Sequence, residues 1–231
     1  MSEGLVSFSA ISTYFECPHK YYLAYIVNAK PLFKPVYEFG RVIHEIIKTY
    51  YNLIPESITP KEVKLYLTQA VKKLGIDPTT RIPMLDNFAR FEESRIAKSI
   101  NSKPVAVEKE FTKPPFRGVV DVIFITLSGE KLVVDWKSSI KGDNETWERL
   151  RLQGNIYMYL TGASRALFYG LWRGNVEEFT YDEKYLMSKY EEFKAGVESK
   201  RFDRVLSDRC SGCEYNVHCL SALWGFEVLE L

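Results

Sequence analysis

The chain has 231 residues, which suits one domain with at most a small appendage. Its composition, 46% hydrophobic and 26% charged, is typical of a globular protein and argues against disorder. With 31 basic and 30 acidic residues the net charge is +1. This excludes a strongly cationic coat protein or a polyacidic tail, but not a local basic groove for nucleic acid.

The first hundred residues predict mostly helix. Ser9 is the expected N-cap of a helix that Pro18 interrupts after Cys17. Helices are also expected over 39–51 and 84–100. Between them another helix is expected, with Thr59 as its N-cap, Pro60 as its first residue and Glu62 completing a capping box, and it ends before Gly75.

Strands rich in Val, Ile and Phe are then expected over 105–111, 116–127 and 131–138, forming an antiparallel meander. The remaining elements are a helix over 147–160, strands over 166–172 and 176–181, a helix over 183–200 and a cysteine-rich tail. The economical interpretation is one α/β domain with a helical flank.

The N-terminal sequence lacks the basic and apolar regions of a signal peptide, and apolar stretches such as 119–127 are too short to span a bilayer. We therefore expect a cytoplasmic protein with no membrane partner. In a reducing cytosol, clustered cysteines more often bind a metal than form disulfides.

Two of the expected strands carry carboxylates. Asp135 and Lys137 are two residues apart and so point to the same face, while Asp121 lies on the preceding strand. A carboxylate among valines is unfavourable unless a cation neutralises it, and a divalent cation held by Asp121 and Asp135 would do so. With Lys137 orienting or deprotonating a water, the group suits metal-assisted phosphodiester hydrolysis. The alternative is an ordinary surface Asp–Lys pair.

Three further polar residues accompany the carboxylates. His44 lies on a helix beside isoleucines, where a histidine packed in the core is the alternative. Gln153 and Tyr157 are four residues apart and so share one helix face, although polar groups near a core would look the same.

Cysteine is the other informative residue type. Cys210, Cys213 and Cys219 form a C-x2-C-x5-C pattern, and Cys17 lies far upstream. Three tail cysteines with His218 would make a zinc knuckle, and four thiolates would hold either tetrahedral zinc or an iron–sulfur cluster.

The motif series resembles the RecB-type branch of the PD-(D/E)xK nucleases. The matching motifs, in the same order, are Gly40-x-x-x-His44, Gly118-Val-Val-Asp121, Asp135-Trp-Lys137 and Gln153-x-x-x-Tyr157. The resemblance implies an α/β restriction-endonuclease-like core, a central mixed sheet flanked by helices. It further implies Mg²⁺ or Mn²⁺ held by His44, Asp121 and Asp135, assisted by the carbonyl of Trp136. Lys137 would be the catalytic lysine, and Gln153 and Tyr157 would help to hold DNA or the site.

The cysteine arrangement resembles the CRISPR-associated protein four family of iron–sulfur exonucleases in particular. This resemblance implies a cluster, 4Fe-4S in preference to 2Fe-2S, on Cys17, Cys210, Cys213 and Cys219. It also implies 5′-to-3′ exonuclease activity on single-stranded DNA, a role in CRISPR spacer acquisition and antiviral defence, and CRISPR integration proteins as partners, with an oligomer such as the rings of some relatives. The alternatives are a RecB-like nuclease of recombination, repair or a mobile element, and a non-cleaving DNA-binding subunit.

We accordingly expect one nuclease domain over 1–231, divided into a mainly helical part (1–103), a nuclease core (104–202) and a cysteine-rich tail (203–231) joined to Cys17 through the cluster. Glu108 and Glu110 are further candidates to approach the site. The candidate phosphate contacts are Arg41, Arg117, Arg149 and Arg151.

Overall fold

The computed structural model describes the chain except residues 1–3, 33–37, 78, 80–81, 99–100 and 224–231. The chain divides into two compact units. We call Met1–Leu5 with Tyr37–Glu183 the sheet unit, and Val6–Val36 with Lys184–Leu231 the cysteine unit. Each is described by itself, and the single nuclease domain stays a prediction.

A mixed β-sheet forms the centre of the sheet unit. Strands β2 (Ala106–Lys113), β3 (Phe116–Ile125) and β4 (Lys131–Lys137) pair antiparallel in sequence order, as the predicted meander requires. Strand β5 (Arg165–Gly170) then pairs parallel with β4, and β6 (Asn175–Thr180) pairs antiparallel with β5. The parallel step is made possible by the long helix between β4 and β5.

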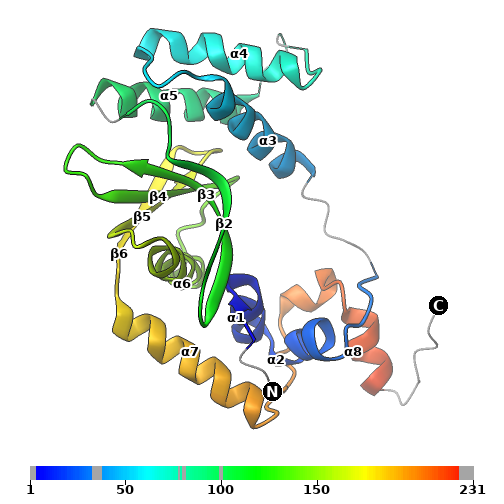
Figure 1. Ribbon diagram of the computed structural model, residues 1–231. Coiled ribbons are helices and arrows are strands. Elements are labelled where there is room, and N and C mark those ends of the chain that lie inside the picture. Colours follow the sequence, from blue (N-terminus) through cyan, green and yellow to red (C-terminus); the bar gives the residue numbers. More distant parts are fainter. Residues whose placement is uncertain (1–3, 33–37, 78, 80–81, 99–100, 224–231) are drawn as a thin grey trace. The chain divides into compact units, whose positions relative to one another are not determined.

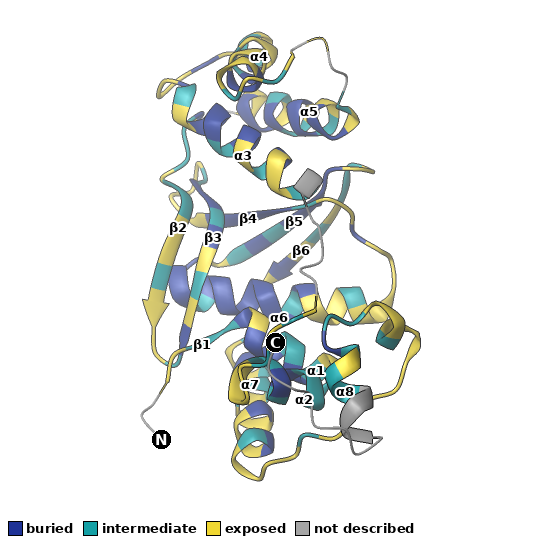
Figure 2. Cartoon of the chain, turned by 90° about the vertical axis from the view of Figure 1, so that its right-hand side faces the viewer, coloured by how far each residue is buried: buried dark blue, intermediate teal, exposed yellow. Residues whose placement is uncertain are grey.

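Helices cover both faces of this sheet (Figure 1). Helices α3 (Glu38–Leu53), α4 (Val63–Lys73) and α5 (Pro83–Ala97) lie on one side, and α6 (Asn144–Thr161) lies on the other. Trp136 of β4 is 2% exposed and meets Phe88 of α5 edge-on, with ring centroids 5.2 Å apart. Helix α6 is dark blue along much of its length in Figure 2, because residues on most of its faces are buried. The expected central mixed sheet flanked by helices is confirmed.

Local signals explain where the helices begin and end. The predicted capping box of Thr59 and Glu62 is present, although it opens on a 3₁₀ turn, η2 (Pro60–Glu62), before α4. Gly75 follows α4 with φ of +72°, in the left-handed region that glycine favours. The side chain of Asp143 accepts a hydrogen bond from the amide of Thr146, so α6 begins three residues earlier than its apolar pattern predicts.

The cysteine unit is mainly helical. It contains β1 (Val6–Ser7), α1 (Phe8–Glu16), α2 (Pro18–Tyr21), the π-helix η1 (Tyr22–Ile26), α7 (Glu183–Glu198, whose first residue belongs to the sheet unit), the 3₁₀ turn η3 (Asp208–Gly212) and α8 (Asn216–Leu223). The prediction of Ser9 as N-cap is wrong: Ser7 accepts the amide hydrogen bond of Ala10, because the helix already begins at Phe8. Tyr14, Tyr21 and Phe193 pack edge-to-face in its core. Across the described residues of both units, no helix is long and apolar enough to cross a membrane.

Candidate active site

The two carboxylates predicted from the strands lie next to each other in the sheet. Strands β3 and β4 pair Val122 with Val134, so Asp121 and Asp135 occupy the next position along both strands, just beyond the last registered pair. The main-chain amide of Trp136 donates a hydrogen bond of 3.0 Å to Oδ2 of Asp121. The strand pair therefore fixes Asp121 beside the segment that carries Asp135.

Asp135 is held by two partners although it is only 3% exposed. Its Oδ1 lies 2.6 Å from Nζ of Lys137, and its Oδ2 accepts a hydrogen bond of 3.2 Å from Gln153. The lysine approaches Oδ1 outside hydrogen-bond geometry, so this buried oxygen has a close positive charge but no hydrogen-bond donor. An acceptor in this state suits a cation as an additional partner.

His44 reaches the carboxylates from α3. Its Nδ1 lies 3.5 Å from Oδ2 of Asp121. Helix α3 also passes close to the residue that follows β4, since a Cβ atom at Gly40 would lie 3.2 Å from Oγ of Ser138 and would require that hydroxyl to shift. His44 follows Gly40 by four residues, about one helical turn.

Burial and nearby charges shift the pKa values of two site residues in opposite directions. Burial and the neighbouring charge of Asp135 raise the pKa of the Asp121 carboxyl well above its usual range. Burial lowers the pKa of His44, although the charge of Asp135 opposes this shift. The imidazole is therefore neutral near pH 7, which is the form that binds a metal, and a cation between the carboxylates would relieve their repulsion.

Gln153 and Tyr157 lie beneath the carboxylates. Nε2 of Gln153 donates to Oδ2 of Asp135 and, over 3.0 Å, to Oη of Tyr157. Gln153 is 5% exposed and Tyr157 is 7% exposed, so their side chains support the site from the protein interior. Burial, followed by the charge of Asp135, raises the pKa of Tyr157, which therefore stays protonated.

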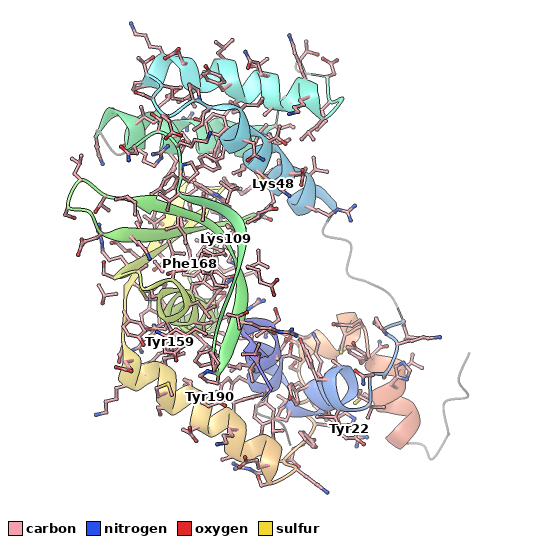
Figure 3. All side chains as sticks on the ribbon, in the orientation of Figure 1. Tyr22, Lys48, Lys109, Tyr159, Phe168 and Tyr190 are labelled. Carbon is pink, nitrogen blue, oxygen red and sulfur yellow. The ribbon has the colours of Figure 1, made fainter. Side chains whose placement is uncertain are left out.

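Glu108 and Glu110 of β2 differ in their surroundings. Glu108 falls opposite Asp121, between the registered pairs Val107–Val122 and Lys109–Val120, and its Oε2 lies 2.8 Å from Nζ of Lys48. Glu110 points to solvent. Sequence reasoning missed Lys48, whose position one helical turn after His44 on α3 was the available signal; Figure 3 labels it.

The four candidate arginines are not equivalent. Arg151 is engaged by Asp182, with Nη2 and Oδ2 3.1 Å apart. Arg41, Arg117 and Arg149 are exposed. Arg41 lies three residues before His44 and therefore on the same face of α3. Arg117 lies four residues before Asp121 and therefore on the same face of β3.

All four cysteines gather in the cysteine unit. They line one cavity of about 90 Å³, together with His19, Lys20 and Tyr215 among others, and none forms a disulfide. Burial raises the pKa of the Cys213 thiol. His218 is directed elsewhere, since its Nε2 lies 2.7 Å from the carbonyl oxygen of Lys30. The cavity therefore favours the four thiols over a zinc knuckle that includes His218.

Neither the carboxylates nor the cysteines are arranged as a complete set of metal ligands. Within the part of the chain that the structure describes, no three His, Cys, Asp or Glu side chains are arranged to hold a metal ion. At the carboxylates this still fits Mg²⁺ or Mn²⁺, because Mg²⁺ is usually bound by one or two carboxylates together with waters and substrate phosphates. The cysteines match an iron–sulfur cluster in donor chemistry and grouping, but their sulfurs are not arranged as a ligand set.

Comparison with known proteins adds two findings. The family model described as "PD-(D/E)XK nuclease superfamily" matches residues 5–220. Among solved structures, the chain is similar to one described as "Crystal structure of SSO0001", with 14% identity and a TM-score of 0.37 over 77% of this chain and 96% of that chain. The structural likeness is too low to carry an argument about either fold or activity.

Proposed function

The chain belongs to the PD-(D/E)XK nuclease superfamily, and on that premise we propose that it is a divalent-metal-dependent deoxyribonuclease that degrades single-stranded DNA from the 5′ end. Nucleases of this superfamily are hydrolases that use Mg²⁺ or Mn²⁺. The finer assignment rests on the motif order and on the cysteine arrangement in the sequence.

One observation carries the proposal. Strands β3 and β4 and helices α3 and α6 bring five side chains together, those of Asp121, Asp135, Lys137, His44 and Gln153. Distances of 2.6 to 3.5 Å link them through the two carboxylates and the amide of Trp136. A surface Asp–Lys pair would not be 3% exposed at its aspartate, nor would it recruit a buried glutamine. The burial of Asp135 and its contact with Gln153 therefore argue against an ordinary surface ion pair between Asp135 and Lys137.

Each residue has a distinct role in this proposal. Asp121, Asp135 and His44 would hold the cation, with the main-chain carbonyl of Trp136 as a further oxygen donor. A bound cation would supply Lewis-acid chemistry, polarising the scissile phosphate and stabilising the negative charge that develops on it. Lys137, whose ammonium group also lies 5.5 Å from the ring centroid of Phe168, orients the attacking water beside Asp135. Gln153 and Tyr157 keep the Asp135 carboxylate in place.

We also propose that Cys17, Cys210, Cys213 and Cys219 hold an iron–sulfur cluster, with 4Fe-4S as the first choice. Their common cavity and the absence of disulfides among them support this assignment. Such a ligand set would connect α1 to the η3–α8 segment within the cysteine unit, so its contribution would be to stability.

The cellular setting completes the proposal. We propose that the enzyme acts in the cytoplasm, in CRISPR spacer acquisition, with CRISPR integration proteins as partners, and the arrangement of the four cysteines in the sequence supports this setting. Recombination, repair or a mobile element is the second setting, and the same nuclease chemistry would serve it.

The test uses purified protein and single-stranded DNA labelled at either end. With Mn²⁺ or Mg²⁺, the wild type should release label from the 5′ end first, and Lys137→Ala should reduce this activity by about a hundredfold or more. A matched control is Lys109→Ala, at an exposed position of β2. Full metal-dependent cleavage by Lys137→Ala would refute the proposed chemistry, whereas release from the 3′ end would refute only the polarity.

A further inference from the structure

One residue near the site has a backbone conformation that its residue type disfavours. Glu108 has φ of +42°, in a strand whose neighbouring residues on both sides keep their register with β3. Glutamate rarely adopts a positive φ, and such outliers persist only where the surroundings hold them. The conformation occurs at the β2 position that lies opposite Asp121.

The side chain of Glu108 is tied to the helix that carries His44. Nζ of Lys48 lies 2.8 Å from Oε2 of Glu108 and 3.7 Å from Oε2 of Glu45. Its negative charge contributes to the pKa shifts of both His44 and Asp121. Glu108 thus lies opposite one proposed metal ligand in the sheet and forms an ion pair with a lysine of the helix that carries another.

Three carboxylates lie at this end of the sheet unit, those of Asp121, Asp135 and Glu108. Lys137 lies against Asp135, and Lys48 lies against Glu108. The neighbours of Asp121 include the main-chain amide of Trp136 and the imidazole of His44. Carboxylate oxygens are the donors that a divalent cation such as Mg²⁺ prefers.

We propose that Glu108 is a third carboxylate of the divalent-cation site, and that Lys48 neutralises it while no cation is bound. The inference rests on the proposed function, since it concerns the same cation. Glu108 would face the cation directly or through one bound water, and Lys48 and the cation would compete for its carboxylate.

This competition has a consequence that an ordinary ion pair lacks. If Glu108 and Lys48 only joined α3 to β2, the removal of either partner would lower stability and leave the cation affinity unchanged. If Lys48 competes with the cation, the two substitutions must act in opposite directions on the cation affinity.

The experiment is calorimetric titration of the full-length protein with Mn²⁺ alone, without DNA. Glu108→Gln should weaken Mn²⁺ binding about tenfold or more, the usual effect of losing a supporting carboxylate. Lys48→Met should tighten Mn²⁺ binding. Glu110→Gln, two residues further along β2 and exposed, is the matched control and should bind like the wild type. Thermal melting of each variant reports its folding.

Two results would overturn the inference: unchanged Mn²⁺ affinity in Glu108→Gln, or weaker binding in Lys48→Met. If Glu108→Gln does not fold, the direction of the Lys48→Met effect decides. Asp135→Asn separates this inference from the proposed function. If the wild type binds no Mn²⁺, or if Asp135→Asn binds it equally well, the proposed function fails. If Glu108→Gln binds Mn²⁺ as tightly as the wild type while Asp135→Asn binds it more weakly, the role of Glu108 is refuted and the proposed function stands.

Discussion

The amide nitrogen of Gln153 lies 3.2 Å from Oδ2 of Asp135, and this hydrogen bond joins the buried face of α6 to the carboxylate at the end of β4. The same nitrogen donates to Tyr157 one turn further along the helix. A glutamine that serves two buried acceptors positions the carboxylate more narrowly than an apolar side chain would.

Gln153→Leu should therefore destabilise the protein. Asp135 and Tyr157 would each lose a buried hydrogen bond, so the free energy of unfolding should fall by about 1–3 kcal/mol, as measured by urea denaturation. Gln69, on the exposed face of α4, offers the matched control Gln69→Leu. Equal stability of the two variants would contradict the role of Gln153.

The stability of the metal-free protein should depend on Asp121. Because burial raises the pKa of this carboxyl, the folded state keeps a proton that the unfolded state releases above about pH 4. As the pH rises from that point through the raised pKa, the folded state loses stability. Urea denaturation in EDTA should record this decline, and Asp121→Asn should flatten it. If the stability of Asp121→Asn fell with pH as steeply as that of the wild type, other titratable groups would be responsible for the decline.

A buried ion pair outside the site should be sensitive to single substitution. Arg95 binds both carboxylate oxygens of Glu92 at 2.7 Å, and Tyr50 and Tyr51 donate to the same carboxylate. Arg95→Met leaves Glu92, which is 0% exposed, without its counter-charge and should lower the free energy of unfolding by about 3–5 kcal/mol.

The double variant Glu92→Leu/Arg95→Met provides the control for that prediction. Removing both charges should recover part of the loss, because no buried charge is then left unpaired. Urea denaturation of the single and double variants makes the comparison, and a double variant less stable than Arg95→Met would contradict the explanation.

Protein purified without oxygen should be brown, with a broad absorption band at the violet end of the visible spectrum. Cys213→Ser should lose this band, because the variant removes one of the four thiols that line the cavity. A colourless wild type with stoichiometric zinc would refute the cluster and favour a tetrahedral zinc site instead.

Most of the fold could be predicted from periodicity and turn residues. The strands of the meander lie within two residues of their expected bounds, since Val, Ile and Phe cluster in them and Gly129 closes the β3–β4 turn with φ of +81°. The first residues of the helices were harder to predict. Ser7 caps α1 although Ser9 is an equally suitable residue type, and Asp143 caps α6 although the apolar pattern begins only at Trp147.

The grouping of the site residues could also be expected, because the motifs in the sequence resemble those of the PD-(D/E)XK nucleases, the superfamily to which the chain belongs. Their contacts could not. No sequence pattern indicates that Gln153 serves two acceptors, or that Glu108 adopts a positive φ opposite Asp121. Both depend on how α3, α6 and β2 pack around the ends of β3 and β4, which is a tertiary property.

The most direct test of the central claim compares the wild type with Asp135→Asn, which removes the charge at nearly constant volume. Cleavage of labelled single-stranded DNA in Mn²⁺ and binding of the same DNA in EDTA should both be measured. We predict that cleavage falls by about a hundredfold or more while the metal-free variant still binds DNA. Full Mn²⁺-dependent cleavage by Asp135→Asn would contradict the assignment of this buried carboxylate as the centre of the active site.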